Sequence, residues 1–427
     1  MQYKEAMQWL YSFKQYGSKL GLERILYLVS RLDNPQSTLK VIHVTGTNGK
    51  GSVCNYIASI LHRAGYSVGI YVSPHLQRFS ERIVINNNEI TNKQLTQLIQ
   101  EMQPIVEDMI KQKNTPTFFE IVTALAFKFF HDQRVDFAVI EVGLGGRFDA
   151  TNVVSPILTL ITNVTLEHTQ QLGETVESIS YEKGGIIKES IPVITAAEGK
   201  AKAVITSISH EKNAPLHTID TTIWERVDQN YQQQTFHIKG MISDYMVTTS
   251  MQGGYQGENI ALALIAIEQL QLDGFYLTQD DIIKGVVTSF NPGRMEIVQK
   301  HPLILLDGAH NPSGMEKLKD TLEQDFIYDR LILIVGILKD KALRPMLSTI
   351  YPLAHTIICT QSENMRACPP QQLQELLKIV GFKGTIYLEP SVRKAIDHAK
   401  KIAEKNDLMC ITGSLYTIGE ARSYLTC

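Results

Sequence analysis

Residues 44–53, V-T-G-T-N-G-K-G-S-V, combine the residue types that bind the phosphates of a nucleotide. Glycines let backbone N–H groups face an anion, and Lys50 supplies a positive charge for the β- and γ-phosphates. The stretch departs from the standard loop G-x-x-x-x-G-K-[ST], because Val44 stands where the first glycine belongs and Gly51 separates Lys50 from Ser52. Ser52 can still reach a Mg²⁺ ion if Gly51 adjusts the turn. Taken alone, the stretch could equally be a glycine-rich turn that carries a surface lysine.

Two carboxylates follow apolar runs that are typical of buried strands. Glu141 ends the run F-A-V-I-E, where a charge is unfavourable unless a cation or a partner neutralises it. A salt bridge is one role; a Mg²⁺ ligand is favoured, because ligands bind at the carboxyl ends of strands in α/β sheets. Asp307 ends a second such run and has the placement of a ligand-facing carboxylate. Arg294 follows Pro-Gly, where it could contact phosphate or be a solvated charge.

A phosphate loop needs a strand that leads into it and a helix whose positive end faces the anion. Residues 41–45 are a short β-branched run, and apolar residues repeat at helical spacing behind the loop, at 53, 56, 57, 60 and 61. Further strand-like runs occupy 68–72, 137–142, 157–161 and 193–195. Continuous apolar strands separated by helices predict a mainly parallel sheet covered on both faces.

The rest of the chain divides at a Pro-Gly interruption. Residues from about 205 to 255 alternate loosely, which predicts a small antiparallel β element, and a helix is predicted from about Glu258. Residues 291–296 contain Pro-Gly and are the predicted linker. Strands are predicted beyond it at 303–306, 331–338, 356–359, 385–388 and 408–412. We therefore predict an α/β protein with a phosphate-loop ATPase domain at 1–290 and a Rossmann-like α/β domain at 297–427.

The composition limits the classes of partner. The 427 residues exceed one ordinary domain, and 44% of them are apolar, which suffices for full cores. A net charge of -3 gives no reason to expect a nucleic acid or a membrane as partner. The cysteines, at 54, 359, 368, 410 and 427, include no C-x-x-C pair, which argues against a disulfide framework or a zinc site. The N-terminus lacks a signal-peptide pattern, so we expect a cytoplasmic protein.

A series of motifs resembles the folylpolyglutamate synthase and dihydrofolate synthase family of the Mur ligase superfamily. The loop T-G-T-N-G-K-G-S is similar to that family's ATP loop, in which a glycine regularly separates Lys from Ser. The other motifs follow in order along nearly the whole chain: S-P-H-L at 73–76 with Arg82-Ile83, E-V-G-L-G-G-R-F-D-A-T-N at 141–152, Thr162-Asn163 to Glu167-His168 with Leu172-Gly173, E-K-G-G-I at 182–186, N-P-G-R-M-E at 291–296, D-G-A-H-N-P at 307–312 and G-S-L-Y at 413–416. The resemblance therefore implies that the loop at 44–53 is the form of phosphate-binding loop that this family uses.

The resemblance implies roles for residues that carry little signal alone. The implied metal ligands are Ser52, Ser73, Glu141 and His168. The implied ATP contacts are Thr47, Asn48, Gly49, Lys50, Gly51, Ser52, Asn259, Arg294 and Asp307. Asn259 matches the adenine-reading asparagine, although Tyr255-Gln256 replaces the His-Gln common before it. Lys183 matches a carbamylated lysine and is taken as catalytic with Lys50 and His310.

The substrate contacts are also implied by resemblance. Asp307, His310 and Ser414 match the glutamate-binding side of the second domain. The pterin pocket would be formed by Thr117, Phe118, Phe119, Glu120, Phe148, Asp149 and Ala150. An aromatic pair is a suitable stacking surface for a flat pterin, although the same stretch alone reads as simple core.

These features together predict an ATP-dependent amide ligase. The resemblance implies that it adds L-glutamate to tetrahydrofolate, and also to dihydropteroate, through an acyl phosphate, with Mg²⁺ and a monovalent cation as further requirements. A monomer that binds only small molecules is expected. Two alternatives stay open at this point: a Mur-type ligase acting on a cell-wall precursor, and a nucleotide-binding protein without ligase activity.

Overall fold

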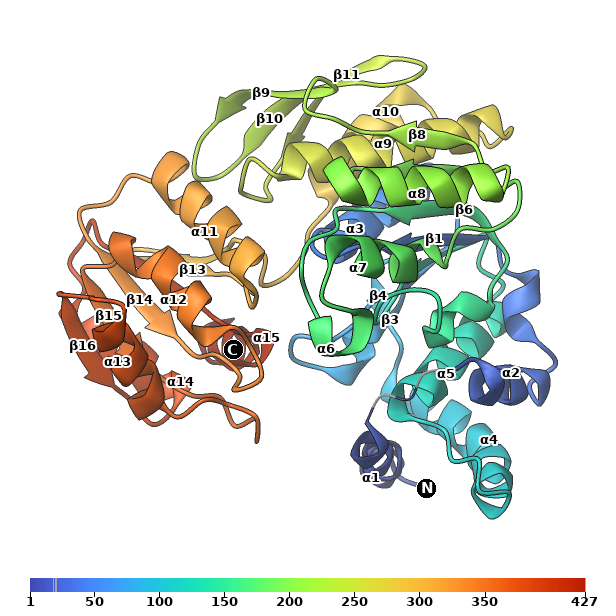
Figure 1. Cartoon of the computed structure of the whole chain (residues 1–427), viewed down its shortest axis with the longest axis horizontal. Coiled ribbons are helices and arrows are strands. Elements are labelled where there is room, and N and C mark those ends of the chain that lie inside the picture. Colours follow the sequence, from blue (N-terminus) through green and yellow to red (C-terminus); the bar gives the residue numbers. More distant parts are fainter. Residues whose placement is uncertain (18, 20, 427) are drawn as a thin grey trace.

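The computed structural model describes residues 1–17, 19 and 21–426, and it shows two α/β domains side by side (Figure 1). The N-terminal domain contains the phosphate loop, and the C-terminal domain begins after the Pro-Gly stretch. The predicted α/β class, with mainly parallel sheets and a small antiparallel element, is confirmed.

The sheet of the N-terminal domain has the strand order β4-β3-β2-β5-β1-β6-β7-β8. From β2 to β8 neighbouring strands are parallel, whereas β3 and β4 add an antiparallel edge. The strands are β1 (Val41–Thr45), β2 (Val68–Tyr71), β3 (Ile83–Ile85), β4 (Asn88–Glu89), β5 (Phe137–Glu141), β6 (Pro156–Ile161), β7 (Val193–Thr195) and β8 (Leu216–Thr218). β1 and β5 lie at the centre, so the loop after β1 and the carboxylate at the end of β5 meet at one edge.

Helices cover both faces of this sheet because the central strands are apolar on both sides. Ile42 and Val44 pack in one core and Val41 in the other. One face carries α3 (Lys50–Arg63), α9 (Gln256–Leu272) and α10 (Gln279–Thr288). The other carries α1 (Tyr3–Ser12), α2 (Glu23–Ser30), α4 (Asn92–Lys111) and α5 (Phe118–Asp132). Beside β6 and β7 lie α6 (Thr169–Leu172), α7 (Val176–Gly184) and α8 (Gly199–Glu211). Short 3-10 turns of this domain span Phe13–Tyr16, Pro35–Thr38, Phe79–Arg82 and Ala150–Val153, and one in the C-terminal domain spans Tyr351–Leu353.

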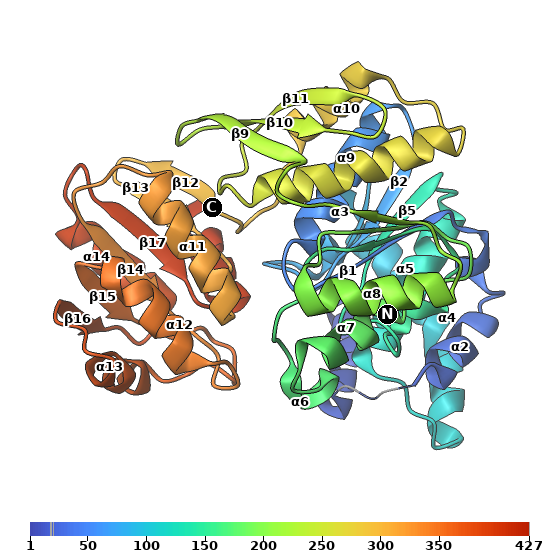
Figure 2. The ribbon, with the colours of Figure 1, turned by 45° about the horizontal axis from the view of Figure 1, so that its top comes forward.

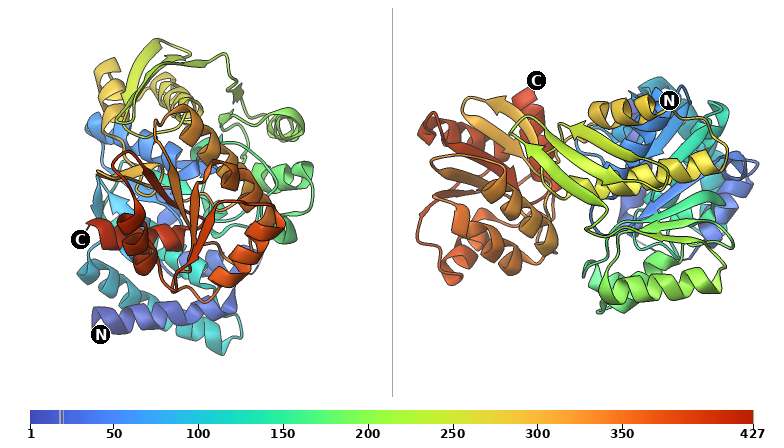
Figure 3. Two further views of the ribbon diagram at one scale, coloured as in Figure 1. Left: turned by 90° about the vertical axis from the view of Figure 1, so that its left-hand side faces the viewer. Right: turned by 90° about the horizontal axis from the view of Figure 1, so that it is seen from above.

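The small antiparallel sheet is formed by β9 (Trp224–Gln229), β10 (Gln234–Lys239) and β11 (Asp244–Thr249), in the order β11-β10-β9. It lies over α9 and reaches toward the C-terminal domain (Figures 2 and 3). The prediction that this element spans 205–255 was too wide. Residues 205–211 belong to α8, where Ile205 and Ile208 are buried at helical spacing, and β8 joins the main sheet.

The C-terminal sheet has the order β12-β13-β17-β14-β15-β16, and only β12 runs antiparallel to its neighbour among the described strands. Its strands are β12 (Glu296–Lys300), β13 (Leu303–Leu306), β14 (Leu331–Val335), β15 (Thr356–Cys359), β16 (Thr385–Leu388) and β17 (Leu408–Thr412). Its helices are α11 (Pro312–Gln324), α12 (Leu343–Ile350), α13 (Pro370–Ile379), α14 (Val392–Ile402) and α15 (Leu415–Thr426). β14 ends before Gly336, so the predicted extension of this strand to residue 338 was wrong.

Two further observations concern hydrophobic helices and cysteines. Within the described residues, no helix is long and apolar enough to cross a membrane. Cys54, Cys359, Cys368 and Cys410 are free and buried, as expected for small core residues, and Cys427 lies outside the described residues.

Candidate active site

The loop between β1 and α3 is held by the end of β6. The Thr47 amide donates to the Asn163 carbonyl at 2.7 Å, the Asn48 amide donates to Asn163 Oδ1 at 3.0 Å, and Thr162 Oγ1 donates to the Asn48 carbonyl at 2.7 Å. Gly46 has a φ of +146°, and a Cβ there would lie 1.8 Å from Thr162 Oγ1. A glycine is therefore required at this position, and the loop is shaped before any ligand arrives.

Two lysines converge on one carbonyl oxygen of this loop. Lys50 Nζ donates to the carbonyls of Gly46 and Thr47, both at 3.0 Å. Lys183 Nζ, on α7, donates to the same Gly46 carbonyl at 2.7 Å. Burial and the nearby Lys50 charge lower the pKa of Lys183 to about 7. The loop thus carries the positive charge of Lys50 beside a lysine whose charge is easily lost, and the Lys50 charge suits a polyphosphate.

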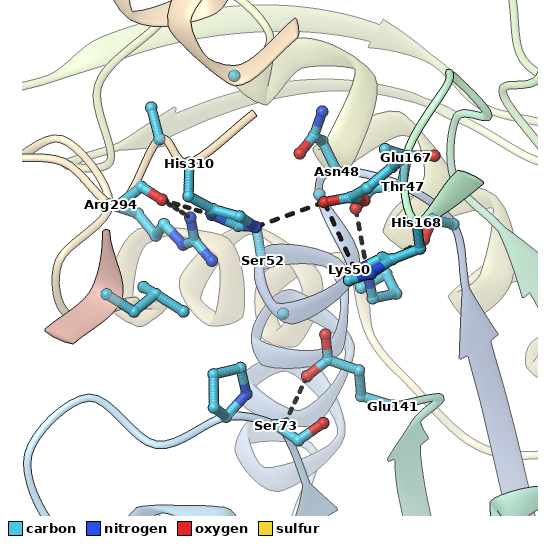
Figure 4. A pocket seen from close by; sticks show the side chains of 18 of the residues that line it. Thr47, Asn48, Lys50, Ser52, Ser73, Glu141, Glu167, His168, Arg294 and His310 are labelled. Atoms are coloured by element: carbon cyan, nitrogen blue, oxygen red, sulfur yellow. Dashed lines mark hydrogen bonds and ion pairs between the residues drawn. The ribbon is translucent and has the colours of Figure 1, made fainter. Parts of the chain in front are cut away.

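The predicted metal ligands lie around the start of α3 (Figure 4). Glu141 Oε2 accepts from the Ser73 amide at 2.9 Å, and burial raises the pKa of this carboxyl while Lys50 opposes the shift. Ser52 Oγ accepts from Asn291 Nδ2 at 3.2 Å. The His168 side chain is 40% exposed, and the partial burial of its ring lowers its pKa. No cluster of three or more His, Cys, Asp or Glu side chains that could hold a metal occurs in residues 1–17, 19 and 21–426. Hydroxyl, water and phosphate oxygens would therefore complete a Mg²⁺ shell, which is the usual pattern for that ion.

The loop is faced from the second-domain side by residues of the linker, of the segment after β13 and of the start of α15. Asp307 accepts from the amides of Met295 and Ala309 at 3.1 and 2.9 Å. Burial raises the pKa of its carboxyl group, and the Arg294 charge only partly opposes this shift. Arg294 Nη1 donates to the Gly308 carbonyl at 3.4 Å. Ser414 is buried at the start of α15, where its hydroxyl accepts from the Thr417 amide at 3.1 Å.

Glu167 connects the two domains, and its role was missed from the sequence. Its Oε1 accepts from Asn311 Nδ2 at 2.9 Å. The same oxygen lies 3.5 Å from His310 Nε2 (Figure 4). Although burial opposes it, the contacts with His310, Lys50 and Asn311 lower the pKa of Glu167, so the carboxylate stays ionised. Asn311 also donates to Asn48 Oδ1 at 3.3 Å. The motif Glu167-His168 was visible in the sequence, but its partner on the other domain was not.

One pocket between the domains brings most predicted residues together. It is lined by predicted residues at 47–52, 73, 141, 168, 183, 259, 294, 307, 310 and 414. It is also lined by residues to which the sequence assigned no site role, among them Asn163, Glu167, Tyr255, Glu258, Lys317 and Arg366. The loop between β1 and α3 therefore opens directly onto polar groups of the second domain.

The comparisons with known proteins agree with this layout. The Mur ligase middle domain family matches residues 44–267, and the Mur ligase glutamate ligase domain family matches residues 293–415. The dihydrofolate synthase/folylpolyglutamate synthase of Bacillus subtilis is 38% identical over 429 residues, covering 99% of each chain. This chain belongs to the folylpolyglutamate synthase and dihydrofolate synthase family.

Solved structures of the family align over nearly the whole chain. A Mycobacterium tuberculosis folylpolyglutamate synthase, complexed with ADP and AMPPCP, has a TM-score of 0.92 at 28% identity and covers 100% of this chain and 99% of its own. The E. coli FolC protein, in complex with DHPP and ADP, has a TM-score of 0.87 at 29% identity and covers 99% of this chain and 97% of its own.

The predicted pterin residues lie apart from this pocket, around the start of α5 and the 3-10 turn at 150–153. Thr117 and Glu120 form a capping box: Glu120 Oε2 accepts from the Thr117 amide at 2.7 Å, and Glu120 Oε1 also accepts from Arg24 Nε at 3.0 Å. The Phe118 ring stacks on Tyr11 with centroids 5.7 Å apart.

The other members of the set differ in exposure. Phe119 packs against Gly143, which lines the pocket, whereas Phe148 is exposed and Ala150 is buried in the core. Asp149 is buried and accepts from the Thr151 and Leu144 amides at 3.0 and 2.8 Å. None of the seven lines the pocket described above. Their assignment to a pterin stays a prediction.

Proposed function

We propose that the protein joins L-glutamate to a folate acceptor with the energy of ATP, using the pocket between its domains. One observation carries the proposal: Lys50 and Lys183, at the phosphate loop, open onto His310 and Asp307 of the second domain within one pocket. Phosphate and amino-acid groups can therefore be held next to each other. Relatives that span the chain bear the names dihydrofolate synthase and folylpolyglutamate synthase.

The reaction follows from charge placement. An oxygen of the acceptor carboxylate attacks the γ-phosphorus of ATP, ADP leaves, and an acyl phosphate forms. Lys50 exchanges its bonds to the loop carbonyls for the γ-phosphate and stabilises the charge that develops there, together with the amides at the start of α3. The neutral glutamate amine then attacks the acyl carbon, phosphate leaves, and the proton lost by the nitrogen passes to the departing phosphate. Asp307, His310 and Ser414 would hold the glutamate for this attack.

The metal and the lysine modification are part of the proposal. Ser52, Ser73, Glu141 and His168 are the residues that would hold Mg²⁺ near the phosphates. When bound, the ion would neutralise phosphate charge and orient the oxygens. A carbamylated Lys183 would place a carboxylate among the cations of the loop, and its lowered pKa favours the neutral amine that such a modification requires.

The proposal also covers the acceptor molecules, the oligomeric state and the cellular compartment. We propose that tetrahydrofolate and dihydropteroate are both accepted and that the pterin lies near Phe119 and Asp149. The enzyme would act as a monomer in the cytoplasm and would respond to a monovalent cation. Four buried free thiols in the described part of the chain are consistent with a reducing compartment.

Mass spectrometry of the products tests the proposal. Reactions would contain ATP, Mg²⁺ and L-glutamate, with dihydropteroate, monoglutamyl tetrahydrofolate or a UDP-sugar peptide as acceptor. Glutamylated product from both pterin acceptors is expected; product from tetrahydrofolate alone would restrict the enzyme to chain elongation. Product only from the UDP-sugar peptide, or none from any acceptor, would refute the proposal.

A variant pair links the reaction to the loop. Lys50→Ala should reduce ligation at least about 100-fold with the fold intact, because it removes charge stabilisation at the transferring phosphate. Lys93→Ala, on the exposed side of α4, is the matched control and should leave turnover unchanged. Unimpaired turnover in Lys50→Ala would contradict the phosphate-loop assignment.

A further inference from the structure

The small antiparallel sheet is joined to the C-terminal domain by an ion pair whose carboxylate is buried and whose arginine is partly buried. Arg226 Nη1, on β9, donates to both carboxylate oxygens of Asp325, at 2.8 and 2.9 Å. The Asp325 side chain is only 1% exposed, and this residue caps the C-terminal end of α11. Nearby, Gln229 Nε2 donates to the Gln324 carbonyl at 2.9 Å. Because either charge would be unfavourable if it lost its partner, the pair fixes where α11 meets β9.

The same guanidinium holds a second, buried side chain. Arg226 Nη1 donates to Gln234 Oε1 at 3.2 Å, and Gln234 Nε2 donates to the carbonyls of Met251 and Gly253 at 2.7 and 2.9 Å. Gln234 is 1% exposed, so both ends of its amide are committed to these contacts. The contacts fix the segment 251–254, which leads directly into Tyr255, the N-cap of α9.

The segment held in this way forms one wall of the pocket. Tyr255, Glu258 and Asn259 line it, and Asn259 lies against Gly49 of the phosphate loop, where an added Cβ would be 2.4 Å from Asn259 Oδ1. Gly253 has a φ of +95°, and a Cβ there would lie 2.4 Å from the Tyr255 ring. The path of the chain before α9 therefore sets where the Tyr255 side chain and the first turn of α9 stand.

The helix α11 extends from the phosphate end of the pocket to this wall. It begins behind Asn311, which contacts Asn48 and Glu167 of the first domain, and it ends at Asp325. Its 13 residues correspond to about 20 Å of rigid helix. Figure 2 shows α11 beside β9, with α9 beneath the small antiparallel sheet. The Arg226–Asp325 contact is therefore a second point of attachment, distant from the phosphate loop.

We propose that Arg226 is a positioning residue for the base of the bound nucleotide, and that it acts through Gln234 and the segment 251–255. The inference rests on the proposed function and on the resemblance, which implies that Asn259, in the first turn of α9, contacts the base of ATP. It goes beyond that function by assigning the small antiparallel sheet a part in holding the base of the nucleotide. Arg226 itself does not line the pocket.

Calorimetric measurement of the Kd for two probes distinguishes this role from a general loss of protein stability. ADP carries the base, whereas inorganic tripolyphosphate occupies only the phosphate loop. In Arg226→Ala, and more mildly in Asp325→Asn, the Kd for ADP should rise about tenfold, the loss expected when a charged hydrogen-bond network is broken. The Kd for tripolyphosphate should change less than about twofold. Arg226→Lys, which keeps the charge, should recover part of the ADP affinity.

Arg330→Ala is the matched control, because Arg330 pairs with the buried Asp407 at 2.6 Å entirely within the C-terminal domain. It should lower Tm as Arg226→Ala does and leave ADP affinity unchanged. Equal weakening of both probes, an unchanged Kd for ADP, or the same loss in Arg330→Ala would overturn the inference. If Arg226→Ala does not fold, the Kd values of Asp325→Asn for ADP and tripolyphosphate test the inference by the same criteria. A wild-type protein that binds no ADP would refute the proposed function as well, whereas normal ADP binding without ligation would refute only that function.

Discussion

Lys183 makes the stability of the protein depend on pH in a way that can be measured without substrate. Its ammonium group is buried against the phosphate loop, with the Gly46 carbonyl as hydrogen-bond partner. Burial and the Lys50 charge lower its pKa from 10.5 to about 7. In the unfolded chain the ordinary value returns. Between pH 7 and 10.5 the unfolded state therefore binds more protons than the folded state, and stability must rise with pH in this window.

The size of the effect follows from the two pKa values. Below pH 7 both states are protonated and the penalty for burying the charge is complete; above pH 10.5 it is absent. Between pH 7 and pH 9 the free energy of unfolding should rise by about 2 kcal/mol from this one group. Replacing Lys183 with Met, which is apolar and unbranched, should remove that rise.

Urea unfolding at pH 7 and pH 9, in buffer free of bicarbonate, measures the difference for wild type and Lys183→Met. Lys93→Met, at an exposed position on α4, controls for the loss of any lysine. The other groups that titrate in this range are present in all three proteins and cancel in the comparison. An identical pH dependence in wild type and Lys183→Met would refute the reasoning that the ammonium group is buried at this place.

The same pKa bears on carbamylation. At pH 7.5 a pKa of about 7 leaves roughly three quarters of the Lys183 amines neutral, against about one in a thousand for an ordinary lysine. Only the neutral amine adds CO₂. With ¹³C-bicarbonate, wild type should show a carbamate signal that Lys183→Met lacks; a wild-type spectrum without that signal would count against the modification.

Further outcomes are expected elsewhere in the site. Gly46→Ala should abolish nucleotide binding, measured by calorimetry, because the new Cβ would collide with Thr162; binding at wild-type affinity would contradict the loop geometry. Glu167→Gln should raise the KM for L-glutamate more than the KM for ATP, because the lost charge frees His310 on the second domain; equal changes in both constants would argue against this. Asp149→Ala should lower stability by about 2 kcal/mol in urea unfolding, because buried amides lose their acceptor, and a change below about 0.5 kcal/mol would show that these bonds are dispensable.

The local elements, and a phosphate-binding chemistry for the loop, could be predicted from the amino-acid sequence alone. A β-branched strand, glycines and an amphipathic stripe occur consecutively at 41–61, and each signal acts over a few residues. The strand ends at Glu141 and Asp307 were recognisable for the same reason. Where signals were weak the boundaries failed: the helix that covers 205–211 was read as part of a β element, because short apolar stretches fit either period.

Which of these residues lie in contact could not be predicted from the sequence and follows from the folded arrangement. Lys183 and Gly46 are 137 positions apart in the chain, and Glu167 and Asn311 are 144 apart. No local pattern encodes such contacts, because they depend on strand order and on the packing of one domain against the other. The pairing of Arg226 with Asp325 likewise exists only because the small antiparallel sheet reaches the end of α11. The pocket between the domains exists only in that arrangement. Burial and neighbouring charges within it, rather than residue type alone, set the protonation states of its lysines and carboxylates.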